Sequence, residues 1–138
     1  MLASGGPEER EHGFTVGTVL FHIRTALVAL DRLEAHGYAF GARRVDILTT
    51  PEREALGARV SEQLGGLATR KLLQHPYYSG GLRFQIWVTD RDGATLPLID
   101  GGVFDWLATL SANRRAVYVA TGVGAQLMAI RFRNAAPP

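Results

Sequence analysis

Acidic and aromatic residues gather beside glycine pairs in the second half of the sequence. "YYSGGLRFQIWV" places Tyr77 and Tyr78 before Gly80-Gly81, and "DGGVFDW" places Asp100 and Asp105 on either side of a second glycine pair. A carboxylate at such a place either caps a helix or receives a substrate amine in the pocket that the glycines leave open. We favour the helix cap for Asp100 and the binding site for Asp105.

The histidines do not form a metal pair, because His12, His22, His36 and His75 are never three or four residues apart. The chain has no cysteine, so thiolate metal sites and disulfides are excluded as well. We expect no metal and no cofactor. The pattern places His22 on a helix surface. His75, beside the tyrosines, is the histidine we would test as an acid–base group, together with Asp105 and Arg83.

Two further motifs are weak. Gly122-Val123-Gly124 follows a predicted strand and could cradle a phosphate, but no third glycine or lysine follows, so we favour a tight turn. Ser79, His75 and Asp100 do not occur with a G-x-S-x-G nucleophile elbow, which argues against a serine hydrolase.

Length and composition fit one soluble domain. The 138 residues carry 46% apolar side chains and a net charge of +2, which does not indicate nucleic-acid binding. We expect a flexible tail over residues 1–12, one domain over 13–134 and a second flexible tail over 135–138. No stretch reaches the roughly 18 consecutive apolar residues of a membrane span, and no signal-peptide pattern opens the chain. The sequence therefore predicts a cytoplasmic protein that does not enter a membrane.

The elements that must position these residues follow from periodicity. Apolar residues at three- and four-residue spacing predict a helix over 15–36, and Thr50-Pro51 opens a second helix that extends to about residue 64. Strict alternation predicts strands over 45–49 and 82–88, a hairpin turn at 90–93 and a returning strand over 94–99, with Pro97 marking an edge or a bulge. Gly101-Gly102 should end that strand.

The remaining elements are a short helix over 103–111, a strand over 116–121 and a last element after Gly124, either helix or strand. Residues 67–75 fit a helical turn or a strand. Strands joined by hairpins, with helices before and between them, predict an α+β fold with an antiparallel sheet and helices packed mainly on one face.

Taken in order, "YYSGGLRFQIWV", "IDGGVFDWL" and "ATGVGAQLM" resemble the C-terminal part of the catalytic core of class II aminoacyl-tRNA synthetases, most closely the histidyl-tRNA synthetase family. The resemblance covers about 50 residues. It implies an amino-acid site, and its candidate residues are Tyr77, Tyr78, Gln85, Asp100, Gly101, Gly102, Phe104, Asp105, Gly122 and Gly124.

The sequence departs from that family at the motifs that bind and activate ATP. The arginine that precedes the tyrosine pair has no counterpart, Gln126 or Leu127 replaces the arginine of the last motif, and the first two class II motifs are absent. The resemblance therefore implies a catalytically degenerate domain that binds an amino acid or serves as a regulatory subunit, as in ATP phosphoribosyltransferase. A protein partner or homo-oligomer is expected. The alternatives are a small enzyme that uses His75 and Asp105, or a structural oligomerisation module.

Overall fold

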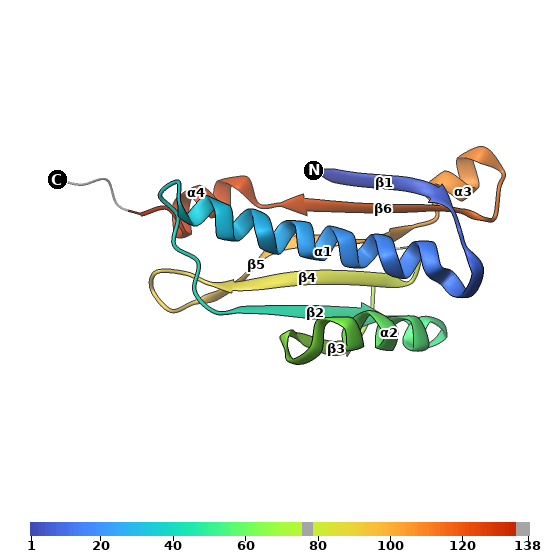
Figure 1. Cartoon of the computed structure of the whole chain (residues 1–138), viewed down its shortest axis with the longest axis horizontal. Coiled ribbons are helices and arrows are strands. Elements are labelled where there is room, and N and C mark those ends of the chain that lie inside the picture. Colours follow the sequence, from blue (N-terminus) through green and yellow to red (C-terminus); the bar gives the residue numbers. More distant parts are fainter. Residues whose placement is uncertain (76–78, 135–138) are drawn as a thin grey trace.

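The computed structural model describes residues 1–75 and 79–134, which form a six-stranded sheet with helices. The order across the sheet is β1-β6-β5-β4-β2-β3, and all neighbours are antiparallel except the parallel pair β2 and β3 (Figure 1). The predicted α+β class is confirmed. The strands are β1 (Leu2–Pro7), β2 (Arg43–Thr49), β3 (Ala68–Leu72), β4 (Leu82–Thr89), β5 (Thr95–Phe104) and β6 (Ala116–Val123).

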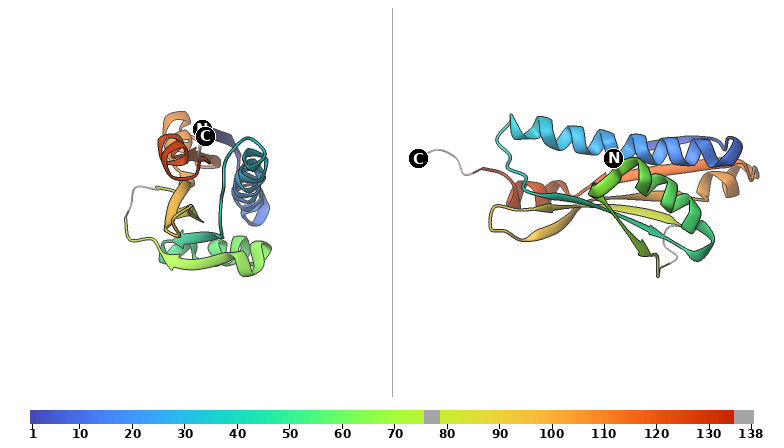
Figure 2. Two further views of the ribbon diagram at one scale, coloured as in Figure 1. Left: turned by 90° about the vertical axis from the view of Figure 1, so that its left-hand side faces the viewer. Right: turned by 60° about the horizontal axis from the view of Figure 1, so that its bottom comes forward.

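Two long helices, α1 (Gly13–Glu34) and α2 (Glu54–Leu64), cover one face of the sheet (Figure 2). The short helices α3 (Trp106–Ser111) and α4 (Ala125–Arg131) precede and follow β6, and 3₁₀ turns occupy Arg10–His12, Pro51–Arg53 and Gly65–Leu67. Both long helices form as predicted. The proline at position 51 opens the 3₁₀ turn that leads into α2, as its fixed φ favours.

The core lies between the two long helices and one face of the sheet. In β4 the side chains of Leu82, Phe84, Ile86 and Val88 are fully buried, and the residues between them are only partly buried. Val19 and Ile23 of α1 pack in the same cluster. The period-two pattern of the sequence therefore identified both the strand and its buried face.

The N-terminal residues differ from the prediction, because residues 2–7 are a strand and not a flexible tail. β1 pairs with β6 from Leu2↔Thr121 to Pro7↔Ala116. Its residues are mostly small, so it lacks the apolar signal of a strand and is held by backbone pairing along the sheet edge.

The second glycine pair was also misjudged. Gly101 and Gly102 continue β5 through Phe104, and α3 begins only at Trp106. A Cβ on Gly101 would lie 2.3 Å from Cζ of Phe84 and 2.7 Å from the Ala120 carbonyl oxygen, so glycine is needed here for close packing within the sheet. Pro97 lies at a β-bulge, one of its two predicted settings.

The segment Arg10–Glu34, which contains α1, corrects the expectation that no stretch is long and apolar enough to cross a membrane. Its 25 residues include a window with a mean hydropathy of 1.5. Core helices of soluble proteins share this property, and here Val19, Ile23 and Leu30 are buried against the sheet.

Candidate functional site

The sheet face opposite α1 and α2, called the open face below, is polar and aromatic where the covered face is aliphatic. Cross-strand register brings its residues together: Gln85 is paired with Asp46 on β2 and with Asp100 on β5, and Asp100 is paired with Gly122 on β6. Because paired residues point to the same side of a sheet, the open face also carries Arg44, Leu48, Arg83, Trp87, Gly102, Phe104, Tyr118 and Ala120.

A hollow of ≈ 470 Å³ lies over β5 and β6 on this face. Five of the residues predicted to bind a ligand line it: Asp100, Gly101, Phe104, Gly122 and Gly124. Gly122 has no atom within 4 Å of the place where a Cβ would stand, so the absent side chain leaves open space on the open face. The hollow lies within the size range of small-molecule sites.

Three aromatic rings form one wall of the hollow: Phe104 and Trp106 are stacked, and Tyr118 is tilted against both. The ring centroids of Phe104 and Trp106 are 4.2 Å apart, and Tyr118 lies 6.2 Å from the first and 5.9 Å from the second. Phe104 is buried, whereas Trp106 is half exposed. Such a wall can stack against a flat or apolar ligand group.

An ion pair joins β4 to β5 beside the hollow. Nε of Arg83 donates to Oδ1 of Asp100 at 3.0 Å, and the second guanidinium nitrogen donates to Oδ2 at 2.5 Å. Both side chains remain partly open to solvent, at 26% and 37%. This two-point geometry fixes a positive and a negative group side by side on the open face.

A second charged group on the open face was not identified from the sequence. The Asp46 side chain is 1% exposed and accepts hydrogen bonds from Nζ of Lys71 at 2.8 Å and from Nε of Arg44 at 2.9 Å. Burial raises the pKa of Asp46, but the hydrogen bonds from Lys71 and Arg44 outweigh it, so the pKa lies below its ordinary value. Arg44 also stacks over Trp87 at 5.1 Å. An aspartate inside the apolar strand "VDIL" is the signal that could have identified this group.

Asp100 and Asp105 do not share one site. Asp100 lies within β5, so its predicted role as a helix cap is wrong. Asp105 occupies the cap position of α3, but its side chain makes no capping hydrogen bond. Its backbone N–H donates to Oγ of Ser79 at 3.0 Å, and the residue lines a different hollow at one end of the sheet.

The residues predicted to carry acid–base chemistry, His75, Asp105 and Arg83, are not linked to one another in the part of the chain that the structure describes. His75 is exposed after β3, and no hydrogen bond or ion pair joins it to Asp105 or Arg83. Tyr77 and Tyr78 lie outside the described residues. Within residues 1–75 and 79–134, no cluster of three or more histidine, aspartate or glutamate side chains could hold a metal.

His22 is buried, and its predicted place on the helix surface is wrong. The ring is 0% exposed, with Nε2 at 2.8 Å from Oγ of Ser4 and Nδ1 at 2.7 Å from Oγ1 of Thr121. The hydrogen bonds to two hydroxyl groups satisfy both ring nitrogens, which explains how a histidine fits between the helix and the sheet. Burial lowers its pKa.

Comparison with known proteins found similarity among solved structures only. No family model and no curated protein matches the chain. Among solved structures, the fold is similar to the RNA-binding domain of threonyl-tRNA synthetase from Cryptosporidium parvum Iowa II, with 15% sequence identity and a TM-score of 0.48. The match covers 83% of this chain and 32% of that one, so it spans about a third of the synthetase structure.

Proposed function

We propose that the open face binds an amino acid, or a closely related small molecule, and that this synthetase-like domain does not activate it. The observation that carries the proposal is the Arg83–Asp100 pair beside a hollow with an aromatic wall. A free amino acid presents a carboxylate and an ammonium group a short distance apart. The guanidinium offers donors to the first and the aspartate accepts from the second.

The rest of the hollow suits the side chain of such a ligand. Phe104, Trp106 and Tyr118 offer a stacking surface, and Gly122 leaves the floor open. A planar side chain gains contact with these rings while its polar end stays near Asp100. Histidine is therefore the first ligand to test, in line with the family that the sequence resembles.

The distribution of charge supports binding without adenylate formation. Stabilising a reacting phosphate requires cations fixed around it. Arg44 and Lys71 both hold Asp46, so these two open-face cations are directed at that carboxylate and not at a phosphate over the hollow. This arrangement therefore favours a role as a regulatory or partner subunit over the catalysis of adenylate formation.

Tryptophan fluorescence gives a direct test, because the chain has two tryptophans and only Trp106 borders the hollow. In a Trp87→Phe background the remaining tryptophan reports on the site. Titration with histidine and then with the other amino acids should give a saturable change. Asp100→Asn should abolish it, and Asp92→Asn, which alters an exposed turn residue, should leave it unchanged.

Two results would refute the proposal. The first is no saturable response to any amino acid by fluorescence or by calorimetry. The second is a response that Asp100→Asn and Phe104→Ala leave intact in a protein that remains folded by circular dichroism. Sedimentation of the same samples separates a binding domain from an oligomerisation module, which would form a tight oligomer without responding to any small molecule.

A further inference from the structure

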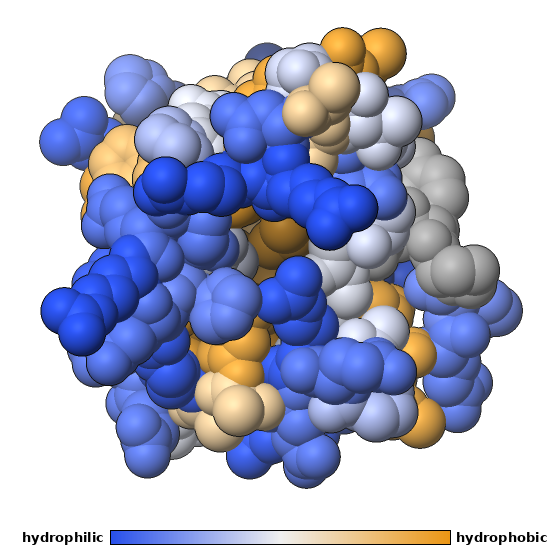
Figure 3. Space-filling view, turned by 90° about the vertical axis from the view of Figure 1, so that its right-hand side faces the viewer, coloured by the Kyte–Doolittle hydropathy of each residue, from blue (hydrophilic) through white to orange (hydrophobic). Residues whose placement is uncertain are grey.

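A second hollow, called the end pocket below, lies at the end of the molecule where α1, α2 and α3 begin. Its volume is ≈ 200 Å³, and Leu56, Val103 and Val117 contribute apolar lining. Figure 3 looks onto this end of the molecule and shows a depression with a hydrophobic floor inside a hydrophilic rim. The polar residues that line the pocket are Glu8, His12, Thr15, Arg53, Ser79, Asp105 and Arg114.

Arg53 is the central observation. Its side chain is partly buried and passes close to Gly81, where an added Cβ would come within 2.8 Å of its Cγ. Two carboxylates line the same pocket, yet among the described residues neither Glu8 nor Asp105 forms an ion pair with Arg53. Among the described residues no carboxylate is paired with Arg53, so its guanidinium can offer its donors to an anionic ligand that enters the pocket.

Glu8 is unavailable to Arg53 because its oxygens are used within its own turn. Oε1 accepts from the backbone N–H of Thr15 at 3.2 Å and from that of Glu9 at 3.0 Å, and Oε2 accepts from the Thr15 hydroxyl. Burial raises the pKa of Glu8, but these hydrogen bonds, mainly those from Thr15, lower it below its ordinary value. The carboxylate is thus a fixed part of the wall.

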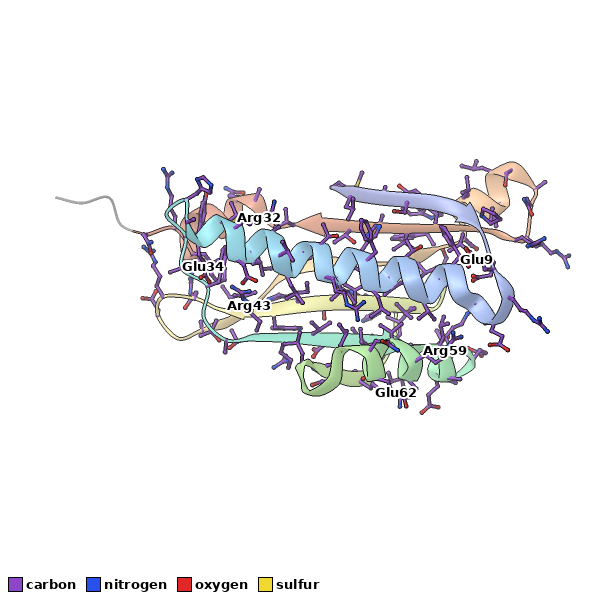
Figure 4. The ribbon with its side chains drawn as sticks, in the orientation of Figure 1. Glu9, Arg32, Glu34, Arg43, Arg59 and Glu62 are labelled. Atoms are coloured by element: carbon purple, nitrogen blue, oxygen red, sulfur yellow. The ribbon has the colours of Figure 1, made fainter. Side chains whose placement is uncertain are left out.

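The turn that follows Glu8 brings an imidazole to the pocket. Glu11 and His12 have φ of 56° and 59°, a left-handed conformation that costs non-glycine residues about 1–3 kcal/mol each. Arg59 of α2 (labelled in Figure 4) donates to the Glu11 carbonyl oxygen, and Nδ1 of His12 lies 3.4 Å from Oε2 of Glu8. These contacts hold the strained turn. Because Nδ1 donates to a carboxylate, Nε2 donates to an anion in the protonated form of the ring.

Two more donors come from separate elements. Oγ of Ser79 accepts from the Asp105 backbone N–H, so its own proton remains to be donated. Arg114 is exposed in the loop between α3 and β6, and no ion pair involves it in the described part of the chain. The end pocket thus combines two guanidinium groups, a hydroxyl and an imidazole from four segments of the chain.

We propose that the end pocket binds the phosphate group of a small phosphorylated molecule. Donors that approach from several directions match a tetrahedral dianion with three acceptor oxygens, whereas a planar carboxylate is satisfied by one guanidinium fork. The volume admits the phosphate and a small organic body, and the apolar floor contacts that body. The end pocket shares Phe104 with the lining of the open-face hollow, but none of its charged residues lines that hollow.

Calorimetry with inorganic phosphate and with glycerol 3-phosphate, in a chloride buffer, tests the proposal. Both should bind saturably, and the ester more tightly because its carbon body reaches the apolar floor. Arg53→Gln should weaken binding by about 10- to 100-fold, the loss expected for a hydrogen bond to a charged group. Asp105→Asn should strengthen it, since a negative charge leaves the rim.

The matched control is Arg133→Gln, which removes an exposed arginine outside the end pocket. Arg53→Lys keeps the charge and should retain part of the affinity, so folding and binding effects are separable. Absence of saturable binding, equal losses in Arg53→Gln and Arg133→Gln, or acetate that binds as tightly as phosphate would overturn the proposal. Asp100→Asn should not affect phosphate binding, so this site and the open face can fail independently.

Discussion

The two faces of the sheet carry different kinds of side chain. On the covered face of β4, Phe84 is fully buried in an aliphatic cluster, whereas the neighbouring Gln85 lies on the open face between Asp46 and Asp100. The covered face carries apolar side chains at every second residue. The open face interrupts that pattern with charged pairs and glycines, which stabilise a sheet less than apolar residues do, and with aromatic rings. We therefore expect stability to depend mainly on the covered face and the proposed binding to depend on the open face.

Adjacent substitutions in β4 test this division most strongly. Phe84→Ala removes a buried ring and should lower the free energy of unfolding by about 3–5 kcal/mol. Gln85→Ala should change it by less than about 0.5 kcal/mol. Urea denaturation followed by circular dichroism measures both. Similar losses in the two variants would show that the open face also belongs to the core.

Glycines in β5 and β6 extend the comparison. Gly101→Ala places a methyl group against the Phe84 ring and the Ala120 carbonyl oxygen, which should cost about 1–3 kcal/mol through overpacking. Gly122→Ala points into open space and should leave stability nearly unchanged while reducing ligand binding at the hollow. Thermal unfolding together with the fluorescence titration distinguishes these effects. A stable Gly101→Ala protein would contradict the packing argument.

Buried His22, which lies between α1 and the sheet, predicts that the stability of the fold depends on pH near neutrality. Burial lowers the pKa of His22 from 6.5, so the unfolded chain binds a proton more readily than the folded one. The contribution of neutral His22 to the free energy of unfolding is fully present above pH 6.5. It is lost as the pH falls through 6.5 towards the lowered pKa, by up to about 1.4 kcal/mol per pH unit. His22→Gln should be less sensitive between pH 7 and 5. Equal sensitivity in urea titrations would assign the effect to other groups.

The open face should respond only in acid, and more weakly. The pKa of Asp46 is lowered from 3.8, so its contribution is present above that pH and is lost as the pH falls through the lowered value. Lys71 and Arg44 are nearly half exposed, which limits the stabilisation. Asp46→Asn should therefore flatten the stability profile below about pH 4 and leave it unaltered above pH 6. Unfolding curves at pH 6 and 3 provide the measurement.

Elements with strong periodicity could be predicted from the sequence, and elements without it could not. The alternation around Phe84 and the spacing in α1 were sufficient because a buried face imposes a period. β1 has no such pattern, because its residues are mostly small and pair with β6 through the backbone. The "DGG" segment was misjudged because a glycine pair, seen in the sequence alone, indicates the end of a strand. In the structure Gly101 lies opposite Phe84, and its small size allows close packing within the sheet.

The candidate site could be predicted only as a set of motifs. Asp100, Phe104 and Gly122 line one hollow, and their binding of a ligand stays a prediction. The ion pair with Arg83 depends on strand register across the hairpin, and the Asp46–Lys71 pair depends on a parallel strand that the sequence left undecided. Such partners are fixed by topology, which single-sequence periodicity does not encode.

The edge strand β1 also has a consequence for solubility. It pairs along β6, whose sequence AVYVATGV has no charge and a strong preference for extended backbone. The other edge strand, β3, carries Arg70 and Lys71, charges that discourage pairing with another sheet. Without residues 2–7, the amide and carbonyl groups of β6 would face solvent as a template for aggregation. The small, sparsely apolar β1 thus protects the most aggregation-prone strand of the protein.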